Sequence, residues 1–158
     1  MRIFLYLLVT ALLIAQFFRP TRNLGVIRGT THIAEVYPVP AQVEGILEKA
    51  CYDCHSNHTR YPWYARVQPL GWWLANHVAE GKEELNFSEF TNLPPEGRAH
   101  KLAEIIEQVE HGEMPLRSYT LLHREANLTQ AEKETLINWA RPGAEKKIPG
   151  KAAPKDSL

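Results

Sequence analysis

The sequence predicts an all-α fold, and three observations lead to this prediction. Apolar residues recur at the 3, 4, 7, 8 spacing of one helical face in the stretches 43–54, 102–109 and 136–140. Thr129 and Glu132 stand three residues apart, which is typical of the capping box that opens a helix. No stretch alternates apolar and polar residues between turn signals, as the strands of a sheet would.

Composition and charge exclude several classes of protein. Lys and Arg number 18 and Asp and Glu number 18, so the formal net charge is +0 and nucleic acid is not an expected partner. A mean hydropathy of −0.33 excludes a polytopic membrane protein. The chain has only 2 cysteines, which excludes a disulfide-dense scaffold.

An apolar stretch opens the chain, running from Ile3 to Phe18 between Arg2 and Arg19. A basic start followed by an apolar run is typical of an export signal. Because an A-x-A cleavage pattern is missing, we expect residues 1–22 to form an uncleaved signal-anchor, that is, an N-terminal membrane helix. A cleaved signal peptide and a buried core helix are the alternatives.

Proline-rich segments flank the central part of the chain. Residues 23–40 end in Tyr-Pro-Val-Pro, a pattern that disfavours helix and predicts an extended linker. Residues 142–158 hold three prolines and little apolar surface, which predicts a disordered tail. The folded domain is therefore expected over residues 41–141.

Four helices are expected in this domain. The first carries both cysteines on its buried face, near its C-terminal end. The second spans Leu70 to Glu84, with Gly71 and Gly81 as candidate interruptions. The third ends at Gly112, and the fourth begins after Thr129 and stops at Pro142-Gly143.

The chemistry is concentrated in the motif Cys51-Tyr52-Asp53-Cys54-His55. Cys-x-x-Cys-His is the attachment signature of c-type haem. Cysteines at i and i+3 lie on one helical face, so both sulfurs of Cys51 and Cys54 can reach the vinyl groups of one porphyrin. The next residue, His55, then offers its imidazole to the iron as the proximal ligand. We therefore expect one covalently bound haem c.

Two other readings of the cysteine pair are open. A thioredoxin-like redox motif would require a βαβ context, which the helical pattern does not offer. A zinc site could draw on Cys51, Cys54, His55 and His58, but the adjacent ligands at 54 and 55 strain a tetrahedral site and no second cysteine pair exists.

The haem expectation also bears on location. Attachment of haem c takes place outside the cytoplasm, so the N-terminus is expected inside and the domain outside. The domain would lie on the periplasmic side of the inner membrane, held by the N-terminal helix, or be secreted to the periplasm if the signal is cleaved.

Met114 is the expected distal ligand, because it is the only methionine besides Met1 and lies in a Met-Pro loop. Ligation by His and Met leaves no open position on the iron and favours electron transfer. His77 and His123 are the competing ligands, and a methionine also serves to fill gaps in a core. The aromatic residues Trp63, Tyr64 and Trp73 are expected in the pocket wall, with ordinary core packing as the alternative.

Three blocks of the sequence resemble the haem-binding domain family of small exported monohaem proteins, which is related to cytochromes c. The first is Cys51 to Tyr64, and the second joins residues 76–82 to residues 85–88. The third comprises Met114-Pro115, Tyr119, His123 and the terminal helix with Trp139. The resemblance covers roughly residues 40–141. It implies a cytochrome c-like helical domain around one covalent haem, but no particular substrate. The segment between His55 and Met114 is longer than the corresponding segment of the most compact cytochromes.

The expected function is that of an electron carrier, not an enzyme, which docks with redox partner proteins. The near-zero net charge disfavours long-range steering toward such partners. The alternative is a haem enzyme or sensor, peroxidase-like or gas-binding, with a labile distal ligand and with His77 or Glu113 as a polar helper. A purely structural or assembly role is a third reading.

Overall fold

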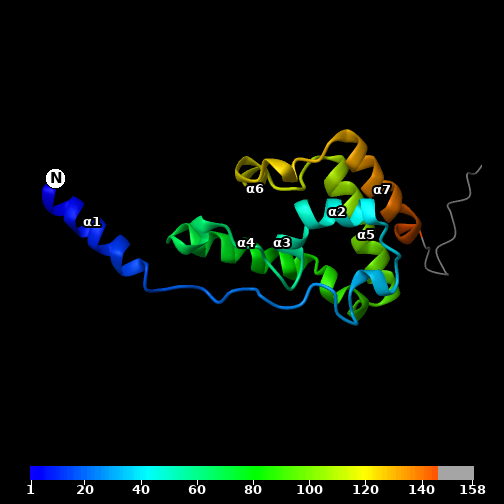
Figure 1. The fold of residues 1–158 in the computed structure, drawn as a ribbon, viewed down its shortest axis with the longest axis horizontal. Coiled ribbons are helices and arrows are strands. Elements are labelled where there is room, and N and C mark those ends of the chain that lie inside the picture. The colour runs from blue at the N-terminus through cyan, green and yellow to red at the C-terminus, as the bar shows by residue number, and fades with distance from the viewer. Residues whose placement is uncertain (146–158) are drawn as a thin grey trace, which may run out of the picture.

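The computed structural model describes residues 1–145, and these residues form helices joined by loops (Figure 1). Within this range the sole β feature is an isolated antiparallel bridge between Leu24 and His58, so the prediction of an all-α fold is confirmed there. The α-helices are α1 (Arg2–Ala15), α2 (Ala41–Ala50), α3 (Tyr52–His55), α4 (Leu70–Glu84), α5 (Pro95–Glu110), α6 (Arg117–Leu122) and α7 (Gln130–Ala144). Short 3-10 helices lie at η1 (Ile33–Glu35), η2 (Trp63–Arg66), η3 (Phe87–Asn92) and η4 (Arg124–Ala126).

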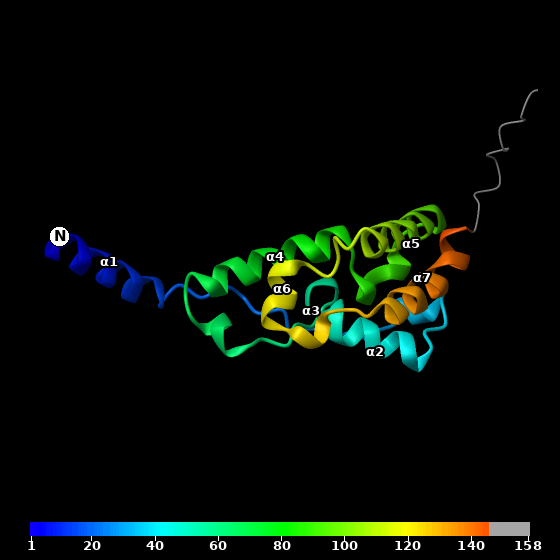
Figure 2. The same ribbon diagram turned by 90° about the horizontal axis from the view of Figure 1, so that it is seen from above.

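The core lies where α2 crosses the pair formed by α5 and α7 (Figures 1 and 2). Each of these helices buries one apolar stripe, and α3 and η3 add aromatic rings to it. Full burial of one such aliphatic side chain contributes about 1.5–3 kcal/mol, so this cluster dominates the stability of the domain. Its most buried members are Ile33, Leu47, Phe87, Phe90, Leu102 and Leu136.

Two of the predicted helix ends are confirmed. α5 ends at Glu110, and Gly112 follows with a φ of +72°, the left-handed conformation that glycine adopts at low cost. α7 opens with the predicted capping box, in which the Thr129 side chain accepts from the Glu132 amide and the Glu132 carboxylate accepts from the Thr129 amide.

The predicted stop of the last helix at Pro142-Gly143 is wrong, because α7 continues to Ala144 with Pro142 inside it. Gly143 is buried against α5. A Cβ atom added there would lie 2.3 Å from Leu102 Cδ1 and 2.8 Å from Tyr37 Cε1. This close approach holds the last turn on the core although the proline cannot donate a backbone hydrogen bond. The tail predicted over residues 142–158 lies outside the described residues from 146 onward.

α4 is continuous from Leu70 to Glu84, so neither candidate glycine interrupts it. Both glycines serve close approach instead. A Cβ atom on Gly71 would lie 2.6 Å from the Ala65 carbonyl oxygen. One on Gly81 would lie 2.9 Å from the Cys54 carbonyl oxygen, so Gly81 lets α4 contact the cysteine motif directly.

The segment expected as a linker, residues 23–40, runs along the domain (Figure 1). His32 and Ile33 are buried in it, at 1 % and 0 % exposure, and the Asn23 side chain donates to the Ser56 carbonyl at 2.9 Å. Further toward the N-terminus, Gln16 and Gln68 form reciprocal hydrogen bonds, which join the end of α1 to the loop before α4.

The expectation of an N-terminal membrane helix is wrong. α1 has 14 residues, whereas a helix needs about 20 predominantly apolar residues to cross a bilayer. Within residues 1–145, no helix combines the length and the apolar composition that crossing requires. Apart from the contacts at its C-terminal end, α1 projects from the helical body, and none of its residues is buried (Figure 1).

Candidate functional site

The cysteine motif forms a separate single turn. α2 ends at Ala50, and Cys51 leaves the helical conformation with φ −125° and ψ −48°. α3 then runs from Tyr52 to His55, with the His55 amide bonded to the Cys51 carbonyl at 2.9 Å. The prediction that one helix carries both cysteines is therefore wrong, since the helix is interrupted at Cys51. The break turns the motif toward α4.

The imidazole of His55 is held by the backbone of α4. Its Nδ1 donates to the Gly81 carbonyl at 2.8 Å and lies 3.1 Å from the Leu85 carbonyl. Because both neighbours are acceptors, Nδ1 carries the proton and Nε2 keeps its lone pair. Burial lowers the pKa of His55, which favours the neutral ring that binds metals. A hydrogen bond at the second ring nitrogen is how proteins orient a histidine ligand.

Both cysteines are free and half-buried. Burial raises the pKa of the Cys51 thiol to about 12 and that of the Cys54 thiol to about 11. These thiols are protonated at neutral pH, unlike the low-pKa thiolates of disulfide oxidoreductases. The thioredoxin-like reading therefore has no support from the structure.

The zinc reading has no geometric support either. The Nδ1 atom of His58 lies 3.1 Å from the Gly25 carbonyl, a backbone partner outside the motif. Among residues 1–145, no three His, Cys, Asp or Glu side chains are grouped so that they could hold a metal ion.

Two adjoining hollows open beside the motif, with volumes of about 370 Å³ and 330 Å³. Cys51, His55 and Met114 line both hollows, and Cys54 lines the second. The structure thus brings the predicted attachment, proximal and distal residues to one place. The rest of the first hollow is lined by the apolar residues Leu47, Leu85, Phe87, Ile105, Val109 and Leu136 and by the polar residues Glu84, Lys101, Glu104, Glu107 and Gln108.

Met114 reaches the hollows from the loop between α5 and α6. The amides of Glu113 and Met114 both donate to the Gln108 carbonyl, at 2.9 Å and 3.2 Å, which ties this loop to the end of α5. Met114 is half-buried and lies outside any helix, as the following proline predicts.

The remaining predicted residues lie elsewhere. Trp63, Tyr64 and Trp73 line neither hollow, and Trp63 is 79 % exposed. They lie in η2 and in the first turn of α4, whereas the site faces the last turns of that helix. His77 lines the second hollow and bonds through Nδ1 to the Trp73 carbonyl at 2.9 Å. His123 lines neither hollow, and its ring stacks on Tyr119 at 4.3 Å.

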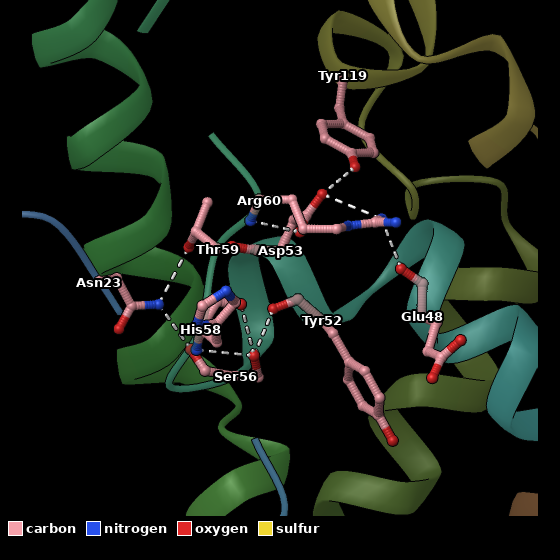
Figure 3. A network of polar contacts seen from close by, with 9 residues as sticks. All are labelled: Asn23, Glu48, Tyr52, Asp53, Ser56, His58, Thr59, Arg60 and Tyr119. Atoms are coloured by element: carbon pink, nitrogen blue, oxygen red, sulfur yellow. Dashed lines mark hydrogen bonds and ion pairs between the residues drawn. The ribbon is translucent and has the colours of Figure 1, made fainter. Parts of the chain in front are cut away.

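Asp53, between the two cysteines, is the hub of a polar network that the motif alone did not predict (Figure 3). Its carboxylate accepts from Arg60 Nε at 3.1 Å and from the Tyr119 hydroxyl at 2.7 Å. Arg60 also donates to the Glu48 carbonyl of α2 at 2.7 Å. The hydrogen bond to Asp53 is the main reason that the pKa of Arg60 is raised. The network joins α2, α3 and α6.

A second set of bonds holds the loop after the motif (Figure 3). The Thr59 hydroxyl donates to the Asp53 carbonyl at 2.6 Å, and Asn23 Nδ2 donates to Thr59 Oγ1 at 3.0 Å. Ser56 is fully buried, with its Oγ 2.7 Å from the Tyr52 carbonyl. These bonds fix the direction in which the chain leaves His55.

A helical domain that gathers two thiols, an oriented imidazole and a thioether around apolar hollows has the features of a haem-binding protein. Comparison with models of known families agrees, since the model for a haem-binding domain matches residues 10–142. The chain therefore belongs to this haem-binding domain family and binds haem. No curated protein and no solved structure is matched by the chain.

Proposed function

We propose that the protein is a monohaem c-type cytochrome that transfers electrons. In this proposal Cys51 and Cys54 hold one haem c through thioether bonds, His55 is the proximal iron ligand and Met114 the distal ligand. The observation that carries the proposal is the placement of Cys51, His55 and Met114 around the same pair of hollows, although Met114 is distant in sequence. The bound haem would supply an iron that cycles between its ferrous and ferric states.

The residues present suit this group. A porphyrin is a large apolar disc, and the first hollow offers an apolar wall from α2, α5 and α7. The bonds from Nδ1 of His55 to the backbone leave Nε2 as the metal-binding atom. The Met114 thioether is a ligand that raises the reduction potential of haem iron. Rigid anchoring of both ligands favours electron transfer over exchange of small molecules.

The location of the loaded domain is part of the proposal. Attachment of haem c requires export, so we infer that the domain works in the periplasm and that the apolar N-terminal segment serves as its export signal. Redox proteins of that compartment are the proposed partners. Fractionation of cells that express the full chain tests this, since the haem-loaded protein should appear in the periplasmic fraction and not in the cytoplasm.

A second candidate function is a haem sensor or enzyme. It is favoured by one observation: His77 and Tyr119 line the second hollow beside Met114 and offer polar groups to an exogenous ligand. Addition of carbon monoxide to the reduced, loaded protein separates the two functions. An electron carrier should keep a six-coordinate low-spin spectrum, whereas a sensor or enzyme should bind the gas rapidly.

A further inference from the structure

The side chain of Tyr119 connects α6 to the cysteine motif. α6 directly follows the loop between α5 and α6 that carries Met114, which we call the distal loop. The Tyr119 hydroxyl donates to Asp53 Oδ2 at 2.7 Å, and this carboxylate belongs to the single turn that holds both cysteines. Tyr119 itself stands at the start of α6, five residues after Met114 in the sequence, and its side chain lines the second hollow. The proximal and distal parts of the site are thus joined by one hydrogen bond.

Little else attaches α6 to the domain. None of its residues is buried, and two of its six residues, Leu121 and Leu122, are 76 % and 58 % exposed. A helix of this length has no stability of its own in water, so its position depends on its tertiary contacts. Since apolar burial is scarce, the partly buried, charge-assisted bond from Tyr119 is the main contact that places the helix.

The acceptor of this bond is itself fixed. Asp53 is 7 % exposed, and its carboxylate also accepts from the backbone amide of Arg60 at 3.0 Å and from Arg60 Nε at 3.1 Å. Arg60 is anchored in turn on the Glu48 carbonyl of α2. The carboxylate therefore stays in place whether or not the distal loop is docked, and it offers α6 a preformed docking point.

The other end of the loop is tied down separately. The amides of Glu113 and Met114 bond to the Gln108 carbonyl, and Gly112 makes the left-handed turn that ends α5. With Tyr119 docked, the segment that carries Met114 is held at both ends. With Tyr119 free, it is held at the α5 end and, beyond α6, only from the buried Ala126 of η4 onward, so the stretch between these anchors can move away from the hollow.

We propose that Tyr119 and Asp53 are positioning residues, whose hydrogen bond docks the distal loop and so sets how readily Met114 yields its place to an external ligand. This inference rests on the proposed ligation by Met114 and adds a way to regulate that same site. A redox or binding partner that contacts exposed α6 could change ligand access at the iron through this one bond.

Imidazole titration of the loaded, ferric full-length protein, followed by its absorption spectrum, tests the inference. Tyr119→Phe keeps the ring and removes only the hydroxyl, and we expect it to bind imidazole about tenfold more tightly than the wild type. Asp53→Asn keeps the shape of the acceptor and weakens the bond, so about a threefold gain is expected.

Tyr61→Phe is the matched control. The Tyr61 hydroxyl accepts from the Asn23 amide at 2.7 Å, outside both hollows and outside α6. Its removal should leave imidazole affinity unchanged, even if both Tyr→Phe variants unfold at the same lowered denaturant concentration. A purely structural role for Tyr119 would change the unfolding midpoint alone.

Met114→Ala, titrated in parallel, separates this inference from the proposed function. If Met114→Ala binds imidazole no more tightly than the wild type, Met114 is not the distal ligand and the proposed ligation fails. If Met114→Ala gains affinity while Tyr119→Phe stays within twofold of the wild type, only the positioning role is overturned. Should Tyr119→Phe fail to accumulate as loaded protein, Asp53→Asn decides, and an affinity equal to that of the wild type overturns the inference.

Discussion

The imidazole of His55 donates to the backbone carbonyl of Gly81 at 2.8 Å, and the same glycine lets α4 touch the carbonyl of Cys54. One residue of α4 thus orients His55, the proposed proximal ligand, and allows the close approach that the bond requires. A side chain at this position would push α4 away from the motif. The sequence suggested that Gly81 could interrupt the helix, whereas in the structure α4 is continuous there and Gly81 allows it to pack against the motif.

Substitution Gly81→Ala should destabilise the protein. The added Cβ would lie 2.9 Å from the Cys54 carbonyl oxygen and 3.1 Å from its Cβ, so the two helices must separate. We expect a loss of about 1–3 kcal/mol in the free energy of unfolding. Denaturant unfolding measures it. Gly45→Ala is the control, because no atom lies within 4 Å of its Cβ position in α2, and a gain of about 0.5–1 kcal/mol is expected there. Equal effects of both changes would contradict this packing.

Substitution Met114→Ala should remove the proposed distal ligand and leave the haem attached. The absorption spectrum of the oxidised protein should change from low-spin to high-spin, since no other thioether lines the hollows among the described residues. His77→Ala is the control and should leave the spectrum low-spin. If the low-spin spectrum is retained in Met114→Ala but lost in His77→Ala, His77 and not Met114 is the distal ligand.

The stability of the protein should fall as the pH drops below 6.5, in part through His32. Burial lowers the pKa of His32 below the ordinary histidine value of about 6.5, so the unfolded chain binds a proton there that the folded chain resists. The contribution of His32 to the free energy of unfolding is therefore complete above pH 6.5. It is lost as the pH falls from there through the lower pKa of the folded state. The unfolding midpoint, measured at a series of pH values in this range, should depend less steeply on pH in His32→Asn than in the wild type. Asparagine is chosen because it can still accept a hydrogen bond from the Ala34 amide, as His32 Nδ1 does. Parallel profiles would refute the role of His32.

Substitution Thr129→Ala should cost about 1 kcal/mol of stability, because the Glu132 amide loses its side-chain acceptor at the start of α7. Chemical denaturation provides the measurement. Thr135→Ala, in the middle of the same helix, is the matched control and should be neutral or stabilising, since alanine is the better helix former. If the two variants lose equal stability, the capping box does not hold the helix.

Local patterns in the sequence predicted those parts of the fold that local contacts determine. The end of α5 at Gly112 and the capping box of α7 are confirmed, because each depends on hydrogen bonds within a few residues. The break at Cys51 was missed, since it depends on how α3 packs against α4. The continuation of α7 through Pro142 was missed for the same reason, as Leu102 and Tyr37 enclose Gly143.

The site shows the same division. The motif and the Met-Pro loop pointed to Cys51, His55 and Met114, which the structure brings together. Hydrophobicity alone suggested Trp63 and Trp73 as pocket walls, but their place along η2 and α4 keeps them out of both hollows. The bond between Asp53 and Tyr119 joins residues far apart in the chain, and periodicity and motif spacing carry no signal for it.

The central claim is that Cys51 and Cys54 hold one haem through covalent bonds. Mass spectrometry under denaturing conditions, on full-length protein matured in a host that assembles c-type cytochromes, tests it most directly. We predict the mass of the polypeptide, or of its signal-processed form, plus one haem, and loss of that added mass when both Cys51 and Cys54 are replaced by alanine. The bare polypeptide mass, with haem released into acid-acetone, would contradict the claim.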